Sequence, residues 1–161
     1  PRSLWFRPTS LDEMVAFMAA HPGARVGAGH TELSVDAKFK GTQYSTLVSP
    51  TSVPELNTIT EVDGLGLLVG GAVTLAMLQT PLERACSDMP EPQTRGFRAL
   101  LDNLRWFAGH QIRSVATLAG NVVWANPISD LNPVLAALDA TLDLASTDGR
   151  RVAPVGTFFE R

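Results

Sequence analysis

A glycine-rich turn near the start of the chain is the first stretch whose residue types can do chemistry. Residues 25–33 read RVGAGHTEL, with two glycines one residue apart and then a histidine, a threonine and a glutamate. Glycine lets the backbone approach a phosphate closely, and successive backbone N–H groups can then bind the anion. A dinucleotide fingerprint, G-x-G-x-x-G, would need a third glycine where Glu32 stands. The pattern therefore disfavours a Rossmann fold and leaves an anion-binding turn or an ordinary glycine turn.

The other residue types that often carry chemistry form no catalytic set. The three histidines, His21, His30 and His110, have no spacing typical of a catalytic triad or a metal site. The lone cysteine, Cys86, excludes an internal disulfide and cannot by itself hold an iron–sulfur cluster or a structural zinc. We interpret it as a buried small hydrophobe, and Trp106 as a packing residue. No catalytic residue and no metal ligand is predicted in this chain.

Composition and charge exclude several classes of partner. The formal charge of −3, with scattered lysines and arginines, disfavours binding to nucleic acid or to an anionic membrane surface. No apolar run is long enough to span a bilayer. Charged residues make up only 18% of the chain, which indicates either surface covered by neighbouring domains or ordinary variation. Because the sequence begins PRSLWF, without methionine, we expect an internal piece of a longer polypeptide.

The first third of the chain predicts a small β-α-β lobe. Residues 11–20 have helical spacing of apolar side chains, and Ser10 with Glu13 forms a capping box at the start of that helix. A short strand then runs into the glycine-rich turn and a second helix through Lys38. STLVSP is a strand closed by Pro50, and PTSVPELNTI, residues 50–59, reads as a connection with a short helix.

The character of the sequence changes from Leu65 onward, where a second lobe begins. A glycine-interrupted strand precedes Thr74, which is expected to cap a helix that Pro81 breaks or restarts. The next helix has one apolar face and is expected to stop at Gly109; the face comprises Phe97, Leu100, Leu101, Leu104 and Ala108.

The last third predicts a short helix and a hairpin. SDLNPVLAALDA is a helix with Ser129 or Asp130 as its cap. Residues 141–155 alternate apolar and polar side chains on both sides of TDG, which is typical of an antiparallel hairpin. The sheet is expected to be unfinished at Arg161.

Several of these stretches together carry a family resemblance. RWFAGHQIRSVATLAGNVVWANPISDLNP, residues 105–133, and VGAGHTELSVDAKFK upstream resemble the flavin-binding domain of xanthine dehydrogenases, as do WFRP and PELN. The likeness covers nearly the whole chain, in the right order and at sensible separations. Aldehyde oxidases and other molybdenum hydroxylases share the fold, but WFAG and PISDLNP are more similar to the xanthine dehydrogenase pattern.

The resemblance implies an α+β fold, a two-lobed FAD-binding domain of the PCMH or vanillyl-alcohol-oxidase-like type. It implies a small β-α-β lobe over residues 1–52. Residues 53–161 would form the first part of a larger lobe, an antiparallel sheet flanked by helices, C-terminally incomplete. FAD would lie in the cleft between the lobes.

The resemblance also assigns a cofactor site. The glycine-rich turn would wrap the FAD pyrophosphate with Val26, Gly27, Ala28, Gly29, His30, Thr31, Glu32 and Leu33. Further contacts would come from Phe107, beside the isoalloxazine ring, and from Thr117, Gly120, Asn121, Ser129 and Asp130. Taken alone, Phe107 reads as a core residue, Thr117 and Asn121 as loop residues that satisfy backbone groups, and Asp130 as a helix cap.

The function implied is electron transfer inside a larger oxidoreductase. Electrons from purine oxidation (hypoxanthine and xanthine to urate) at a molybdopterin cofactor would pass through two 2Fe–2S clusters in other domains to FAD here. They would then pass to NAD or oxygen. The partners implied are those remaining domains, NAD and a second copy in a homodimer, in the cytoplasm or alternatively the peroxisome.

Two alternatives remain open at this point. One is the flavin domain of an aldehyde oxidase or another molybdenum hydroxylase, and the other is a scaffold domain that has lost its flavin. Three departures from the family pattern favour the scaffold. His30 stands where asparagine is usual, Ala119 where glycine is common, and Trp124, otherwise a packing residue, where a small hydroxyl residue is frequent.

Overall fold

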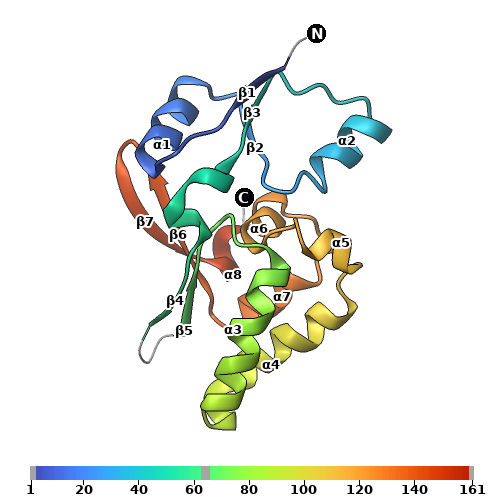
Figure 1. Ribbon diagram of the computed structural model, residues 1–161, viewed down its shortest axis with the longest axis vertical. Helices are drawn as coiled ribbons and strands as arrows, with labels where there is room; N and C mark the ends of the chain where they lie inside the picture. The colour runs from blue at the N-terminus through green and yellow to red at the C-terminus, as the bar shows by residue number, and fades with distance from the viewer. Residues whose placement is uncertain (1–2, 63–65, 160–161) are drawn as a thin grey trace.

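The computed structural model describes residues 3–62 and 66–159 and shows an α+β fold with a sheet at one end and helices at the other (Figure 1). The first sheet has three parallel strands in the order β1-β3-β2, namely β1 (Leu4–Phe6), β3 (Thr46–Val48) and β2 (Arg25–Val26). The predicted β-α-β arrangement is confirmed for β2, the helix α2 (Leu33–Phe39) and β3. Strand β1 was not predicted, because three residues are too short to show an alternating pattern.

Helix α1 (Leu11–Ala20) begins at the predicted cap. Ser10 Oγ accepts a hydrogen bond from the backbone N–H of Glu13 at 3.2 Å. The Glu13 carboxylate reaches back to the N–H of Thr9 at 2.7 Å, one residue before the usual partner in a capping box. Phe17 stacks between Phe6 and His21, with ring centroids 3.9 and 4.0 Å away, which fixes the helix against the sheet.

The loop between α2 and β3 is tied back to its helix by polar side chains. The Lys40 Nζ lies 2.7 Å from Asp36 Oδ1, and the Tyr44 hydroxyl donates to Asp36 Oδ2 at 3.2 Å. The hydrogen bond from Lys40 is the main reason why the pKa of Asp36 is lowered from its ordinary value of 3.8. A carboxyl group with a lowered pKa stabilises the fold above its unfolded-state pKa, and that contribution is lost as the pH falls through its folded-state value.

We therefore expect Asp36→Asn to flatten the acid side of the stability profile. The variant should lose less stability than the wild type as the pH is lowered below about 4. Hydrogen exchange of the amides in residues 33–45, measured between pH 3 and 7, follows this local stability. Parallel profiles for the two proteins would contradict the role of Asp36.

The expected connection is confirmed, but it holds two short 3-10 helices, η1 (Pro50–Ser52) and η2 (Pro54–Asn57), where one short helix was expected. An antiparallel hairpin of β4 (Ile59–Val62) and β5 (Gly66–Val69) follows. Leu65, where the strand was expected to begin, lies outside the described residues. Strand β4 was not predicted, and its first residue, Ile59, had been taken as the end of the connection.

The long helices form an antiparallel pair, α3 (Leu75–Asp88) and α4 (Glu91–Trp106) (Figure 1). Thr74 caps α3 as expected, since its hydroxyl oxygen accepts from the N–H of Met77 at 3.2 Å. The expectation that Pro81 breaks this helix is wrong, because α3 continues through it. Burial of Leu78 and Leu82 on either side of the proline offsets the backbone hydrogen bond that proline cannot make.

The expected ends of α4 also need correction. The helix begins at Glu91 and ends at Trp106, so Ala108 is not on its apolar face. Phe107 is the first residue to leave the helical conformation, with ψ 103°, and Ala108 follows in the left-handed region with φ 47°. Gly109 instead precedes the short helix α5 (His110–Arg113). Trp106 is 86% exposed, so the packing role expected for it is wrong, and Cys86 is half-buried rather than buried.

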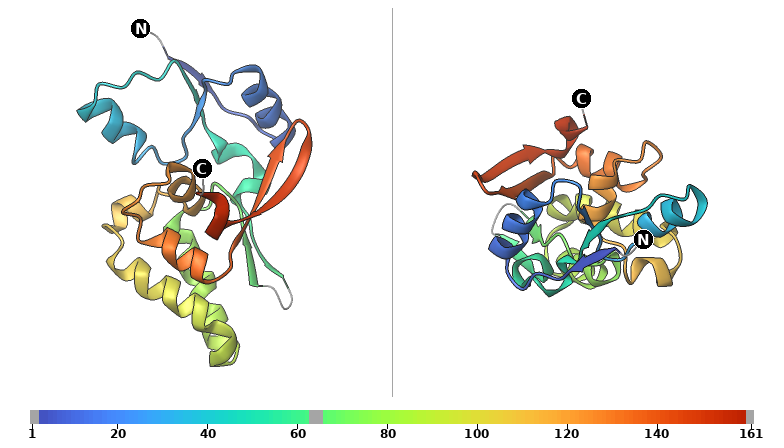
Figure 2. Two further views of the ribbon diagram at one scale, coloured as in Figure 1. Left: turned by 180° about the vertical axis from the view of Figure 1, so that it is seen from behind. Right: turned by 90° about the horizontal axis from the view of Figure 1, so that it is seen from above.

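The remaining elements are α6 (Leu118–Trp124), α7 (Leu131–Ala137), the hairpin of β6 (Thr141–Ser146) and β7 (Gly149–Pro154), and α8 (Val155–Phe158). The predicted hairpin around the TDG turn is confirmed. It passes beside α1 and so joins the helical end of the molecule to the sheet end (Figures 1 and 2).

One apolar core fills the helical part. It is formed by nine buried side chains from α3, α4, α6, α7 and α8: Leu75, Leu78, Leu82, Leu100, Leu104, Val122, Leu131, Leu135 and Val155. Within the described ranges, the antiparallel strands form two separate hairpins packed around these helices rather than one continuous sheet. The cleft lies between the glycine-rich turn after β2 and the residues of α5, α6 and the loop that precedes α7.

Candidate functional site

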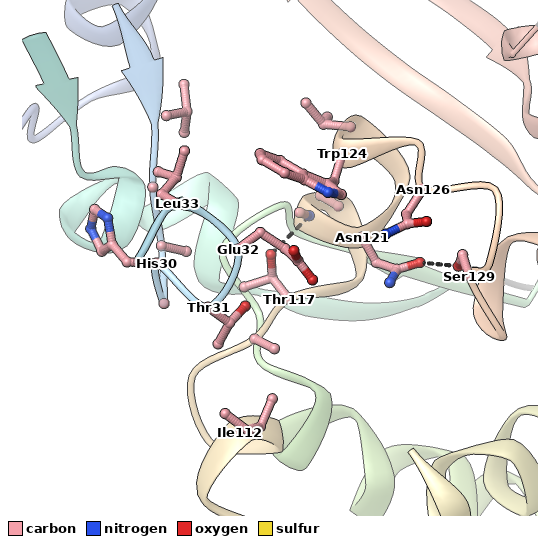
Figure 3. A pocket seen from close by; sticks show the side chains of 18 of the residues that line it. His30, Thr31, Glu32, Leu33, Ile112, Thr117, Asn121, Trp124, Asn126 and Ser129 are labelled. Atoms are coloured by element: carbon pink, nitrogen blue, oxygen red, sulfur yellow. Dashed lines mark hydrogen bonds between the residues drawn. The ribbon is translucent and has the colours of Figure 1, made fainter. Parts of the chain in front are cut away.

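An open cleft of about 440 Å³ separates the glycine-rich turn from the helical part (Figure 3). All fourteen residues expected to contact a cofactor line it: Val26, Gly27, Ala28, Gly29, His30, Thr31, Glu32, Leu33, Phe107, Thr117, Gly120, Asn121, Ser129 and Asp130. Residues separated by about a hundred positions in the sequence therefore face one space. Its size is typical of a site for an organic ligand.

The turn presents a run of free backbone donors. Val26 ends strand β2 beside Val48, and the N–H of Gly27 donates to the Val48 carbonyl at 2.9 Å. The N–H groups of the next six residues, 28–33, have no acceptor anywhere in residues 3–62 and 66–159. Consecutive unpaired N–H groups that line a cleft can bind the oxygens of an anion.

A side chain would be in close contact with a neighbour at both glycines of this turn, but only at Gly29 is that neighbour backbone. A side chain on Gly27 would run into the imidazole of His30, and one on Gly29 would overlap the backbone carbonyl of Val115. The turn therefore lies directly against the segment between α5 and α6, at a separation that leaves no room for a methyl group. Gly29 brings the two walls of the cleft together.

His30 has an unusual backbone conformation that its residue type tolerates. Its φ is 55°, in the left-handed region where asparagine and histidine are enriched among non-glycine residues. Histidine can therefore adopt this conformation, as can the asparagine that the family resemblance leads us to expect at this position. The imidazole lies beside Trp5, with ring centroids 5.2 Å apart, and on the far side of the turn from Thr117 and Asn121 (Figure 3).

The opposite wall is built by the start of α6. The Thr117 oxygen Oγ1 accepts the N–H of Gly120 at 2.9 Å and so caps α6, which leaves the hydroxyl proton free to donate. The N–H of Leu75 donates to the carbonyl of Ala116 at 2.8 Å, so the start of α3 holds this segment in place. Thr117 therefore does what its residue type predicts for a loop and also presents a donor to the cleft.

Asn121 is oriented by Ser129. The Ser129 hydroxyl donates to Asn121 Oδ1 at 2.5 Å and accepts the backbone N–H of Asn132 at 3.1 Å. With its oxygen held in this way, Asn121 keeps its two Nδ2 donors for a ligand. The two alternatives for the cap of α7 are thus resolved, because the hydroxyl of Ser129 is the capping group and the Asp130 side chain makes no cap hydrogen bond.

We expect Ser129→Ala to cost about 1 kcal/mol of stability at the start of α7, the usual value of a lost cap. It should also weaken ligand retention, because Asn121 is then free to turn. Hydrogen exchange at Asn132, together with ligand content, measures both effects. Ser45→Ala is the matched control, since Ser45 is exposed and its hydroxyl has no bonded partner in the described part of the chain. Equal behaviour of the two variants would contradict this account.

The electrostatics of the cleft depend on the backbone rather than on cationic side chains. No lysine or arginine is among the described residues that line it, and its charged members are Glu32 and Asp130. Glu32 extends from the turn in the direction of α6 (Figure 3). An anion bound here would be held by neutral N–H donors, so its binding is expected to depend only weakly on salt.

Sequence reasoning missed ten further lining residues, all but Asn126 apolar: Pro50, Gly71, Ala108, Ile112, Ala116, Ala119, Val123, Trp124, Asn126 and Ile128. Val123 and Ile128 are 74% and 82% exposed, so no core pattern reveals them. Trp124 had been taken as a packing residue, but it lines the cleft. All three departures, His30, Ala119 and Trp124, lie in the cleft wall without closing it.

No group of three or more histidine, cysteine, aspartate or glutamate side chains placed to hold a metal ion occurs in the part of the chain that the structure describes. No helix in that part is both long and apolar enough to cross a membrane.

Comparison with known proteins identifies the class of domain to which this cleft belongs. Residues 1–161 match the family model of the FAD-binding domain in molybdopterin dehydrogenase. The chain is 41% identical to "Xanthine dehydrogenase/oxidase" of Gallus gallus over 150 residues, which covers 93% of this chain and 11% of the relative. It is 39% identical to "Aldehyde oxidase 2" of Rattus norvegicus over 158 residues, which covers 98% of this chain and 12% of the relative.

A solved structure gives the same result. Quinoline 2-oxidoreductase from Pseudomonas putida 86 superposes with a TM-score of 0.80 and 28% identity, covering 98% of this chain and 52% of the other. The fold and the match over the whole chain define a flavin-binding domain of the molybdenum hydroxylases. The chain belongs to the family of FAD-binding domains of molybdopterin dehydrogenases, and it spans about one eighth of the length of the curated relatives it matches.

Proposed function

We propose that FAD binds in the cleft, with its pyrophosphate against the glycine-rich turn and its ring system toward Phe107. The observation that carries this proposal is the run of unpaired N–H groups in residues 28–33 facing a wall of polar side chains across one cleft. A dinucleotide such as FAD has groups that match these walls: its pyrophosphate is an anion for the backbone N–H groups, and its flavin is an aromatic ring for Phe107. These backbone N–H donors fit FAD, the cofactor in the name of the family whose model the chain matches.

The remaining side chains have roles that follow from their contacts. Phe107 is half-buried, touches the apolar core and lines the cleft, so its ring offers an aromatic surface to the flavin. Such a contact contributes about 0.5–1.5 kcal/mol. Thr117 and Asn121 offer the free donors described above, and Asp130 is the nearby acceptor. Bound FAD supplies the chemistry of accepting and passing on electrons, while the chain holds and shields it.

We propose further that the whole protein is a xanthine dehydrogenase-like molybdenum hydroxylase that oxidises hypoxanthine and xanthine to urate. Iron–sulfur clusters would deliver electrons to this domain, and NAD or oxygen would remove them. The 41% identity to the chicken protein supports this proposal. An aldehyde oxidase is the second candidate, because the rat aldehyde oxidase is 39% identical over nearly the same span.

The proposal also covers the division of the chain into two lobes and the partners of the domain. Residues 1–52 would form a small lobe, and residues 53–161 the first part of a larger one, with FAD between them. The other domains of the polypeptide, NAD and a second copy in a homodimer would be its partners, in the cytoplasm or the peroxisome. The exposed apolar side chains of Trp106 and Phe39, 86% and 74% accessible, support cover by other domains.

The first experiment is the visible absorption spectrum of the full-length protein, followed by heat release and identification of the flavin. We expect FAD in a one-to-one ratio with this domain. A folded protein without flavin would contradict the proposal and make the domain a scaffold. Reduction of NAD with xanthine, compared with oxidation of an aldehyde, then separates the two candidate enzymes.

A further inference from the structure

Arg113, the last residue of α5, connects that helix to the turn after α4. Its Nη1 donates to the backbone carbonyls of Phe107 at 2.8 Å and of Ala108 at 2.6 Å. The side chain is half-buried, and it has no carboxylate within ion-pairing distance among the residues that the structure describes. The guanidinium group therefore stabilises the turn after α4 by hydrogen bonding rather than forming a surface ion pair.

The turn needs such support because its backbone is strained. Phe107 leaves the helix with ψ 103°, and Ala108 then has φ 47°. A left-handed conformation is disfavoured for any residue with a β-carbon, and no glycine relieves it here. The two carbonyls lie just after the C-terminus of the 16-residue helix α4, where a cation also interacts favourably with the helix dipole.

The strained residues are those that set the direction of Phe107. Phe107, Ala108 and Ile112 line the cleft, whereas Arg113 is not part of the described lining. If the turn relaxed, the ring of Phe107 would move relative to the glycine-rich turn opposite. Arg113 therefore acts on the cleft only through the backbone that carries Phe107.

We propose that Arg113 is a positioning residue that holds the Phe107 ring in the orientation in which it contacts the flavin. This inference rests on the proposed function, since it requires FAD in the cleft. Lysine is a poorer substitute, because a guanidinium group is planar and keeps further donors beside the two carbonyls, whereas an ammonium is a compact charge on a flexible stem.

The test is a double-mutant cycle in the full-length protein with Arg113→Met, Phe107→Leu and both together. We expect Arg113→Met to weaken FAD retention about tenfold to a hundredfold, the range for the loss of a hydrogen bond to a charged group. It should also change the visible circular dichroism of the bound flavin. In the Phe107→Leu background the same substitution should change neither quantity further, and Arg113→Lys should restore part of the wild-type signal.

Arg98→Met is the matched control. Arg98 also donates to a backbone carbonyl of another helix, that of Cys86 at 3.2 Å, but it does not line the cleft. It should leave FAD content and the flavin spectrum unchanged.

The outcomes separate this inference from the proposed function. Wild-type protein without FAD would overturn both. Two results would overturn only the role of Arg113 in a wild-type protein that holds FAD. One is that Arg113→Met has no effect, and the other is that it reduces FAD retention equally in the wild-type and Phe107→Leu backgrounds. Loss of the effect in that background, with partial rescue by lysine, would establish it.

Discussion

Replacing Gly29 with alanine is expected to reduce FAD retention by roughly fifty- to a hundredfold while leaving the helical core intact. The added β-carbon would overlap the carbonyl group of Val115, which is backbone and cannot turn away as a side chain can. The turn would have to withdraw from the segment between α5 and α6. The expected factor corresponds to about 2–3 kcal/mol, within the usual cost of overpacking.

The substitution should affect FAD binding in particular, because the backbone groups that it displaces are the N–H donors expected to bind the pyrophosphate. The six N–H groups of residues 28–33 must converge on one anion, and a shift of the turn misaligns all of them at once. FAD content after desalting, with hydrogen exchange of α3 and α4, measures binding and core integrity in the same samples.

Gly23→Ala is the matched control for this substitution. A β-carbon at Gly23 meets nothing within 4 Å, and the residue lies in the same sheet end of the molecule. This variant should keep its FAD and gain slightly in stability, because alanine has less backbone entropy to lose on folding. Equal FAD content in the two variants would show that the glycine-rich turn does not hold the cofactor.

The contrast between these glycines shows what the sequence could and could not predict. Two glycines spaced as Gly27 and Gly29 indicate close approach to something, and spacing alone leaves open whether that is a phosphate or protein. The family resemblance named a flavin, and all fourteen residues it implied lie along one cleft. The structure adds that Gly29 approaches Val115, a tertiary contact across 86 positions that no local pattern contains.

The failures of sequence reasoning have a common physical cause. Gly109 was expected to end α4, but the left-handed residue is Ala108, supported from outside by Arg113. Pro81 was expected to break α3, but buried leucines on both sides keep the helix whole. In each case a tertiary contact offsets a local preference of about 1–3 kcal/mol. Such contacts cannot be read from the residues at the site itself.

Substituting a buried leucine of the apolar core should weaken flavin retention in the cleft, as substituting a residue of the cleft wall does. Leu131 begins α7, is fully buried among the side chains of the apolar core, and follows directly after Ser129 and Asp130. Leu131→Ala is expected to cost about 2–5 kcal/mol, because the cavity left behind adds to the lost burial. That loss is a large fraction of the stability of an ordinary domain.

The cost should appear first at the cleft and then in the whole domain. Ser129 holds Asn121 only while the start of α7 stays packed, so flavin retention should fall at temperatures where the fold itself persists. Leu68→Ala is the matched control, since Leu68 on β5 is 55% exposed, and it should change stability by less than about 0.5 kcal/mol. Native-state hydrogen exchange of the α7 amides in the full-length protein measures the difference. If Leu131→Ala destabilised α7 and left flavin retention unchanged up to global unfolding, the Ser129–Asn121 contact would not be what couples the core to the cofactor.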